Sequence, residues 1–560
     1  MKMNIKKTLV GLLTLCMAFS VCGCNLSFGG NSGSQTVNGV TYETVVKAQE
    51  TKTLKQNESI TYTIDKDITG KDYVVFKLNT NVNLLGKYVY HDVENASKVV
   101  EEEFFIEAAQ TEFKQFLDGY RANAKGAFDK QLKTITLTNI DQKEGAVEMK
   151  DISVGNREFP ELERELYVEG KNLKVGADLA TGGALTYLER LSYVDDNGVA
   201  QTIDEVISHD DEVEIGVNAK EGAKAHLSSS VNLINIYDAG RQFQQSFYSN
   251  VGGTSADHWD KMEAGGYYDK LPEDYGSNGY DRAMCKTAHK DGYFWPYNPV
   301  QGGDVACNPS QIIDFEVTKN EIYVKTRAMD WAKGRMGDNL IGTVQGGVTT
   351  KSYMENWYTI KGDMVFVTNR FIDWNGFEGM ESVPTHSNEL PAAYVVHPLH
   401  NYVCYTGNRP WNGEELEWQP ELGSWAASSH RNYNPAEEWF AWVNDEGFGV
   451  GVYIPNTTVF CSGRSNATTS SVYSNNNNAY ASPMANEYRY NKPEATYPQQ
   501  SCYVGNTCYT APVVSWTMRA YQPMSYQYII AVDYLEVMRE SFKYVNESGE
   551  MKNEQLHAWD

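Results

Sequence analysis

The sequence is short of basic residues. Its 560 residues include 48 Lys and Arg against 73 Asp and Glu, which gives a formal net charge of -25. Proteins that bind nucleic acids hold the phosphates with a surplus of Lys and Arg, so this balance argues against a nucleic-acid partner. It suits a soluble surface that an anionic membrane repels.

Motifs of well-known catalytic and metal sites are also missing. The chain has no GxSxG, P-loop or HExxH pattern, and no cysteine spacing matches a zinc site of two CxxC pairs. His386, His397 and His400 lie close together in the sequence, but their spacing matches no recognised metal signature. We therefore expect no bound metal and no cofactor.

Long apolar runs are limited to one, "TLVGLLTLCMAFSV", which follows three lysines and is too short for a stable membrane span. The small residues before Cys24 resemble a bacterial lipobox. The resemblance implies a signal peptide over 1–23, a lipid on Cys24 and a protein anchored to the bacterial membrane or cell surface. The alternative is an ordinary secretory signal with an incidental cysteine. The polar stretch over 24–50 is expected to be a flexible tether.

Cysteine is scarce as well. Of nine cysteines, Cys16 and Cys22 belong to the signal and Cys24 carries the expected lipid. Six remain, at positions 285, 307, 404, 461, 502 and 508. An even number in an exported protein permits disulfides, and Cys502 with Cys508 could close a short loop, but sequence alone leaves the pairing open.

Aromatic residues are plentiful beside only 17 Pro: the chain has 37 Tyr, 12 Trp and 20 Phe. Sugars are bound by such rings, because a ring face covers the C–H face of a pyranose while the polar edge forms hydrogen bonds. A β-rich core with ordinary aromatic enrichment explains the composition equally well.

Residues 51–158 show short β-branched or aromatic runs separated by turn residues, which predicts a small β-sandwich. These runs are interrupted by the stretch "AAQTEFKQFLDGYRANA", whose apolar residues have helical spacing. We expect it to form either a helix or a loop with an amphipathic turn. The ending "LKTITLTNIDQKEGAVEMKDISVGNREF" is similar to the last two strands of a jelly-roll carbohydrate-binding module.

The region 159–535 opens with "LKVGADLATGGALTYLERL", in which a glycine turn separates two strands. This resembles the opening of galactose-mutarotase-like supersandwich domains, so we expect an all-β chain: a jelly-roll-like sandwich followed by a large supersandwich. Residues 536–560 hold the one plausible terminal helix, or a tail.

Several further stretches, including "DAGRQFQQSFY", "FWPYNPVQGGD" and "EEWFAWVNDEGFGVGVYIP", are similar to secreted bacterial supersandwich proteins of polysaccharide-degrading organisms. The resemblance implies an oligo- or polysaccharide partner. It names no particular enzyme family.

The stretch "NLINIYDAGRQFQQSFYSN" sets polar residues densely among apolar ones. Asp238 and Arg241 form either a buried ion pair that joins two sheets or part of a site in which Arg241 holds a uronate or sulfate. Gln244 and Gln245 offer the donors and acceptors that hydroxyl-rich ligands require. We interpret the stretch as a site lining.

The stretch "FWPYNPVQGGD" has the composition of a structured binding loop. Trp295 offers a stacking face, and Asn298, Gln301 and Asp304 offer polar groups. The alternative is a rigid structural turn.

Two further stretches supply carboxylates. Glu389 follows His386 and precedes an apolar run, a setting that raises a carboxyl pKa and suits a general acid. Glu438 lies beside Trp439, and strand alternation sends it and Glu437 to opposite faces. We expect Trp411, His386 and Trp439 to bind the substrate.

These residues favour a glycoside hydrolase that cleaves an extracellular glycan with two carboxyl groups, chosen from Asp238, Asp304, Glu389 and Glu438. A polysaccharide lyase acting on a uronate is the alternative. In it Arg241 would neutralise the uronate, and His386 or Tyr248 would abstract the proton. A surface glycan-binding lipoprotein without catalysis, and an epimerase, are the other possibilities.

Overall fold

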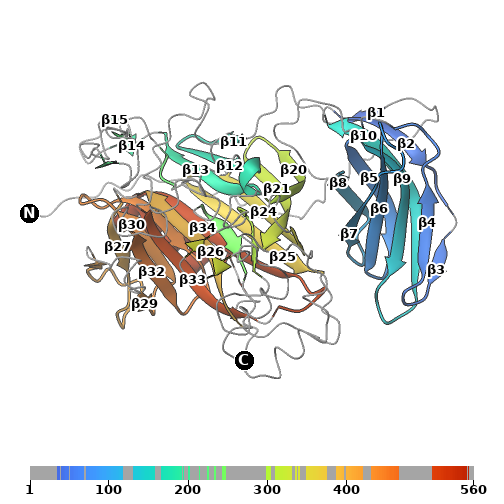
Figure 1. Cartoon of the computed structure of the whole chain (residues 1–560). Coiled ribbons are helices and arrows are strands. Elements are labelled where there is room, and N and C mark those ends of the chain that lie inside the picture. Colours follow the sequence, from blue (N-terminus) through green and yellow to red (C-terminus); the bar gives the residue numbers. More distant parts are fainter. Residues whose placement is uncertain are drawn as a thin grey trace, which may run out of the picture.

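In the computed structural model most of the described residues form antiparallel strands, and one α-helix lies among them (Figure 1). The described residues are 35–37, 40–49, 51–68, 71–117, 130–157, 165–191, 193–194, 200–201, 213–214, 224–225, 232–234, 242–247, 298–303, 310–330, 335–336, 339–340, 349–374, 386–396, 399–419, 431–465, 507–516, 518–551 and 553. The predicted all-β class is confirmed.

The N-terminal part is a sandwich of two antiparallel sheets (Figure 1). The first sheet consists, in spatial order, of β1 (Gln35–Val37), β2 (Val40–Val46), β10 (Gly145–Arg157), β5 (Tyr73–Thr80) and β8 (Glu112–Phe116), with β3 (Lys52–Leu54) also paired to β10. The second consists of β4 (Ser59–Thr63), β9 (Lys130–Asn139), β6 (Leu84–Asp92) and β7 (Val99–Ile106).

The strand pattern of the sandwich follows from alternation. In β6 every second residue, from Leu84 to Tyr90, is buried in the core of the sandwich, where Tyr88 stacks on Phe104 of β7 and lies beside Phe76 of the other sheet. The strands predicted within 51–158 are confirmed.

Two local predictions in this part need correction. β1 and β2 lie inside 24–50, which we expected to be a flexible tether: β2 pairs with β10, and β1 pairs with β2. The stretch expected to form a helix or a loop contains β8 instead. Pairing with β5 buries Phe113 and Phe116, and this burial outweighs the helical spacing.

The second part is built on one fifteen-stranded antiparallel sheet. Its strands, in spatial order, are β28 (Glu417–Gln419), β27 (Asn401–Cys404), β30 (Trp439–Val443), β31 (Phe448–Tyr453), β34 (Met524–Tyr534), β25 (Met364–Asp373), β24 (Thr349–Lys361), β21 (Glu321–Asp330), β19 (Pro299–Val300), β18 (Gln244–Ser246), β26 (His386–Val396), β33 (Thr507–Trp516), β32 (Phe460–Ser465) and β29 (Arg431–Tyr433), with β20 (Gln311–Val317) also paired to β21.

Small sheets complete the described strands. They are β11 (Glu165–Glu169) with β12 (Leu173–Asp178) and β13 (Ala184–Arg190), then the pairs β14 (Tyr193–Val194) with β15 (Ala200–Gln201), β16 (Val213–Glu214) with β17 (Lys224–Ala225), and β22 (Arg335–Met336) with β23 (Asn339–Leu340). A 3-10 turn, η1 (Leu179–Thr181), joins β12 to β13, and one buried core links their apolar side chains to the inner face of the large sheet.

The predicted C-terminal helix is present as α5 (Leu535–Ser548). It buries Met538 and Phe542 against β30 and β31, and it ends at Gly549, whose φ of 61° is the left-handed conformation that glycine accepts readily. No helix in the described ranges is long and apolar enough to cross a membrane.

The sandwich lies against the outer face of the large sheet, beside β20, β21 and β24 (Figure 1). Phe105 of the sandwich stacks on Trp374, and its backbone N–H donates to the hydroxyl of Tyr353 at 3.2 Å. Arg370 forms ion pairs with Glu107 of the sandwich and with Glu355 of its own sheet. The two parts therefore share an interface with both an apolar and a charged component.

Three cysteines lie in the described ranges: Cys404 and Cys508 are buried, and Cys461 is half-buried. Cys508 is buried on β33 and Cys502 lies outside the described residues, so a disulfide between them stays a prediction.

Candidate functional site

A row of alternating charges crosses the outer face of the large sheet where the sandwich meets it. The strand register places Asp314 opposite Lys325, Lys325 opposite Glu355, and Glu355 opposite Arg370. Side chains directly opposite one another on neighbouring strands lie on the same face and interact. We call these four residues the charged row.

A second row lies two residues further along the same strands. Here Glu316 is opposite Tyr323, and Tyr323 is opposite Trp357. Because side chains two positions apart share a face of a strand, this row lies beside the charged row. The rings of Tyr323 and Trp357 are half-buried, 5.0 Å apart between centroids and inclined at 33°.

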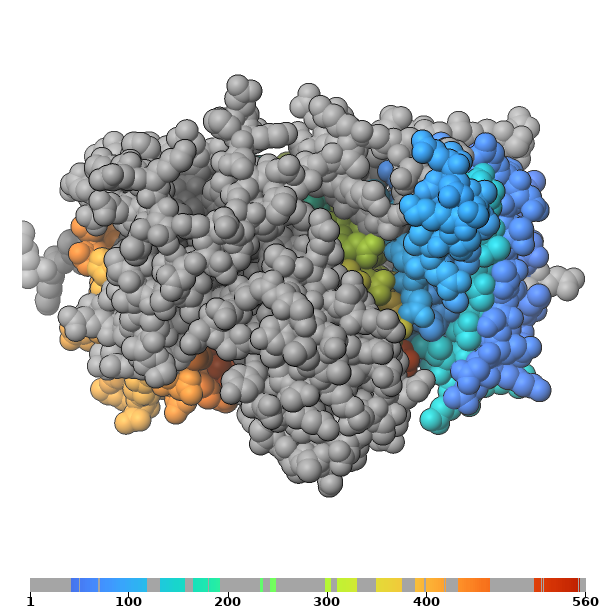
Figure 2. Space-filling model, viewed as in Figure 1, coloured from blue at the N-terminus to red at the C-terminus, as the bar shows by residue number. Residues whose placement is uncertain are grey.

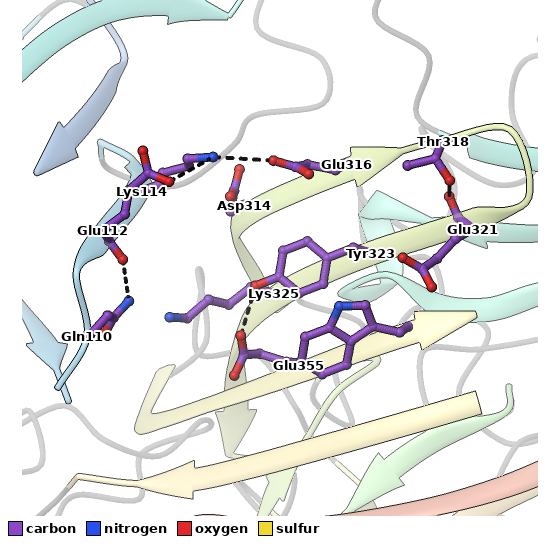
Figure 3. A pocket seen from close by; sticks show the side chains of 11 residues that line it. Gln110, Glu112, Lys114, Asp314, Glu316, Thr318, Glu321, Tyr323, Lys325 and Glu355 are labelled. Atoms are coloured by element: carbon purple, nitrogen blue, oxygen red, sulfur yellow. Dashed lines mark hydrogen bonds and ion pairs between the residues drawn. The ribbon is translucent and has the colours of Figure 1, made fainter. Parts of the chain in front are cut away.

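These rows and the sandwich enclose a cavity of about 280 Å³ (Figure 3). Its walls come from β8, from the adjoining turn, and from β20, β21 and β24. The lining residues are Gln110, Glu112, Lys114, Asp314, Glu316, Thr318, Glu321, Tyr323, Lys325, Glu355 and Trp357. Figure 2 shows the strands of the large sheet in the gap beside the sandwich.

Glu355 is held in its ionised form. Its carboxylate accepts hydrogen bonds from the Tyr323 hydroxyl at 2.8 Å and from Arg370 at 2.7 Å. Burial alone raises the pKa of Glu355, but the nearby charges of Lys325 and Arg370 and these hydrogen bonds outweigh it, so the net shift is downward. Burial and the Glu355 charge raise the pKa of Tyr323 well above its usual value, so the phenol stays protonated.

Lys325 differs from the other cations around the cavity. Only 8% of it is exposed, and its Nζ lies 4.3 Å from the ring centroid of Tyr353 and 5.3 Å from that of Phe113. No hydrogen bond or ion pair to another described residue engages this ammonium, although Glu355 interacts with it electrostatically. In Figure 3 the amine points into the cavity. Because the amine faces the cavity, it can donate hydrogen bonds to a ligand oxygen there.

Lys114 brings the sandwich into the same site. Its Nζ lies 3.4 Å from a carboxylate oxygen of Glu112 and 3.4 Å from one of Glu316. Burial alone lowers the pKa of Lys114, but the carboxylates around it, chiefly Glu112 and Glu316, reverse the shift and raise it. The cavity is therefore completed by residues from both parts of the chain.

Comparisons with known proteins give a limited result. No protein-family model matches the sequence, and a search of curated proteins finds no significant match. A solved putative aldose 1-epimerase from Escherichia coli K12 is 8% identical and overlaps 66% of this chain and 99% of its own, with a TM-score of 0.25.

Two larger solved proteins also overlap this chain. An alpha-mannosidase from Enterococcus faecalis V583 is 8% identical over 85% of this chain and 45% of its own, with a TM-score of 0.29. A 4-alpha-glucanotransferase from Thermococcus litoralis is 9% identical over 66% of this chain and 39% of its own, with a TM-score of 0.26. These likenesses carry no argument about function.

The glutamines predicted to line a site are buried within the sheet. Gln244 accepts a hydrogen bond from the backbone N–H of Gly302 at 2.8 Å, and Gln301 accepts one from Gln245 at 3.1 Å and donates one to Gly182. Both glutamines of β18 and Gln301 are at most 3% exposed. These three amides therefore hold the core together by hydrogen bonds and do not form a sugar-binding surface.

Gln245 nevertheless has a connection to the cavity. Its Nε2 donates to the backbone carbonyl of Glu355 and to the side chain of Asn356, each at 2.9 Å. It therefore fixes the stretch of β24 that carries Glu355. Asn298 is fully buried, and neither of its polar side-chain atoms has a hydrogen-bond partner among the residues that the structure describes.

The two described carboxylates of the predicted catalytic set do not line the cavity. Glu389 is half-buried on β26, where burial and its charge raise the pKa of the Cys461 thiol to about 11. Glu438 is half-buried before β30, and burial together with its charge raises the pKa of Tyr453. Their catalytic role stays a prediction.

The neighbouring Glu437 is a structural residue. It is fully buried and accepts two hydrogen bonds from Arg539 of α5, at 2.6 and 2.9 Å, and further bonds from the Trp439 indole and the Trp411 backbone. Trp439 has no exposed surface, so the expectation that it stacks on a substrate is corrected. Trp411 is half-buried and packs against the core beneath α5.

The remaining predicted residues lie outside the described ranges: Cys24, Asp238, Arg241, Trp295 and Asp304. His386 begins β26, but its side chain is not among those described. Sequence reasoning missed Lys325, Glu355 and Trp357, although "EIYVKTRAM" and "MENWYTIKG" alternate polar and apolar residues and are charged on one face. Only the register between their strands reveals that these faces coincide.

Proposed function

We propose that this chain binds a carbohydrate in the cavity between the sandwich and the large sheet. One observation carries the proposal: the Tyr323 and Trp357 rings adjoin carboxylates and a buried ammonium, Lys325, that has no hydrogen-bond acceptor among the described residues. Sugar sites combine an aromatic face with a few fixed polar groups in this way.

Each part of the cavity has a role in that proposal. The exposed part of the Trp357 ring covers the C–H face of a sugar ring. The ionised Glu355 accepts hydrogen bonds from sugar hydroxyls, and Lys325 donates to a hydroxyl oxygen deeper in the cavity. Lys114 and Gln110 close the cavity from the sandwich side.

Hydrolysis of the bound glycan is a second candidate, as the sequence predicts. It is favoured by the ionised state of Glu355, which suits a base or a nucleophile, and by the presence of Asp314, Glu316 and Glu321 in the same cavity. In this proposal one of those three carboxyls protonates the leaving oxygen.

Export and attachment to the membrane through a lipid on Cys24 are likewise proposals from the sequence. Metabolic labelling with a radioactive fatty acid tests them: the wild-type chain carries the label, and Cys24→Ala does not.

A glycan array with the purified chain tests the binding function. The first neutral oligosaccharide found is titrated into the wild type, Trp357→Ala and Trp418→Ala; Trp418 is an exposed tryptophan on β28 that does not line the cavity. We expect Trp357→Ala to weaken binding about tenfold and Trp418→Ala to leave it unchanged. Equal affinities of all three proteins would contradict the proposed site.

The same oligosaccharide separates a binding protein from a hydrolase. New reducing ends that appear with the wild type and fall at least about a hundredfold with Glu355→Gln support hydrolysis. Binding without any new reducing ends leaves the chain as a glycan-binding protein.

A further inference from the structure

We infer that the cavity accepts uncharged or amine-bearing sugar rings and excludes rings that carry a carboxylate or a sulfate. The inference rests on the proposed carbohydrate site and specifies its substrate class. It also bears on the alternative that the chain is a lyase acting on uronates, because such an enzyme must accept an acidic ring.

The charges that line the cavity are unequal. Five carboxylates face two ammonium groups, an excess of three negative charges in about 280 Å³. An added anion is repelled over these short distances, and a sugar without negative charge avoids that cost.

The cations that could offset an anion are already engaged. Lys114 interacts with Glu112 and Glu316, and Arg370 is shared between Glu355 and Glu107. Because carboxylates of the protein already pair with both cations, a carboxylate on the sugar would have to displace one of them.

Lys325 is the remaining cation, and its position also disfavours an anion. It lies opposite Asp314 on one neighbouring strand and opposite Glu355 on the other. An acidic group placed on this ammonium therefore stands beside two carboxylates. A neutral hydroxyl oxygen satisfies the ammonium as an acceptor without adding charge.

The far end of the cavity favours a donor on the ligand. Glu316 and Glu321 lie near the hairpin between β20 and β21, and Figure 3 shows Glu321 beside Thr318 and Glu316 facing Lys114, both away from the Lys325 amine. The carboxylate of Glu321 accepts a 2.6 Å hydrogen bond from Thr359 and has further capacity to accept. A sugar hydroxyl or ammonium supplies such a donor, and a carboxylate does not.

Competition by two matched sets of monosaccharides tests the inference: glucose, glucosamine and glucuronate, and galactose, galactosamine and galacturonate. Saturation-transfer NMR with the full chain is recorded for the wild type and for Trp357→Ala, and only the signal lost in the variant is counted. We expect the neutral or amino member of one set to bind and its uronate to bind at least about tenfold more weakly.

A charge variant makes the test independent of the sugar's shape. Glu316→Gln with Glu321→Gln removes two of the five carboxylates, so we expect it to narrow the difference in affinity between a uronate and its neutral counterpart roughly tenfold. Glu540→Gln with Glu547→Gln removes two carboxylates from the exposed face of α5 instead. We expect this control to leave the affinity for both sugars unchanged.

Two outcomes overturn the inference. If a uronate binds the wild type as tightly as its neutral counterpart, with a signal that depends on Trp357, the selectivity is absent while the proposed sugar site stands. If none of the six sugars gives a Trp357-dependent signal, and the array shows no such glycan either, the proposed function fails and the inference fails with it.

Discussion

The hydroxyl of Tyr73, in the sandwich, donates a 2.6 Å hydrogen bond to the carboxylate of Asp314, in the large sheet. Both residues are buried, at 2% and 5% exposure, and Asp314 belongs to the charged row that lines the cavity. The bond therefore connects the position of the sandwich to the geometry of the proposed site.

Removing that hydroxyl is expected to destabilise the protein. Hydrogen bonds to charged groups contribute about 1.5–3 kcal/mol, so Tyr73→Phe should lower the free energy of unfolding in urea by about that amount. Tyr544→Phe, at a tyrosine on α5 that is 69% exposed, is the matched control and should have no measurable effect. Equal stability of both variants would show that the interface does not depend on this bond.

Lys325 should behave as a residue kept for binding. Lys325→Met removes an ammonium without a described hydrogen-bond acceptor, but also a charge that helps to keep Glu355 ionised, so we expect the free energy of unfolding to change by less than about 2 kcal/mol while sugar affinity falls at least about tenfold. Urea unfolding and titration with the array-selected oligosaccharide measure the two effects.

The control for Lys325 is Lys361→Met. Lys361 also lies over a ring, 4.3 Å from the centroid of Phe366, but it is about half exposed and pairs with Glu550 at 3.6 Å. It should change neither quantity appreciably. A large loss of stability in Lys325→Met would assign this lysine a structural role instead.

The ion pair of Glu437 and Arg539 should be essential to the docking of α5. Arg539→Leu leaves a fully buried carboxylate without its cation and is expected to cost about 3–5 kcal/mol of stability. Arg409→Leu breaks an arginine–glutamate pair whose arginine is 74% exposed, and it should cost at most about 1 kcal/mol. Similar losses in both variants would contradict the special role of the buried pair.

Glu355 should contribute to stability in a way that depends on pH. Its pKa in the folded protein lies below the ordinary value of 4.5, so ionised Glu355 stabilises the fold above that value, and this contribution is lost as the pH falls through the lowered pKa. Between about pH 5 and pH 3, Glu355→Gln should therefore lose less stability than the wild type. Glu547→Gln, on the exposed face of α5, should keep the wild-type acid transition, and identical curves for all three proteins would rule out the contribution.

Cys461 should be poorly reactive, and Glu389 should be part of the reason. A pKa of about 11 leaves little thiolate at pH 9, so alkylation with iodoacetamide, followed at the Cys461 peptide by mass spectrometry, should be slow in the folded chain. Glu389→Gln removes one cause of the raised pKa and should speed the labelling. Glu438→Gln should not, and an equal effect of the two variants would contradict the placement of Glu389 beside this thiol.

The sequence by itself determined the all-β class, most strands of the sandwich and the terminal helix. These features follow from short-range patterns in the sequence, such as the alternation of buried and exposed residues along β6 or the spacing of Met538 and Phe542 on α5. Where a short-range pattern competed with strand pairing, as in β8, the pairing prevailed and the helical expectation failed.

Only the tertiary structure decided which residues form the candidate site. Lys325 and Glu355 are thirty positions apart in the chain, and they become neighbours through the register of β21 with β24. The same folding buries Gln245 and Gln301, which are plausible sugar ligands by composition, and uses their amides inside the core. The physical reason is that a side chain's type is fixed by the sequence, but its exposure and its partners depend on which distant strand packs against it.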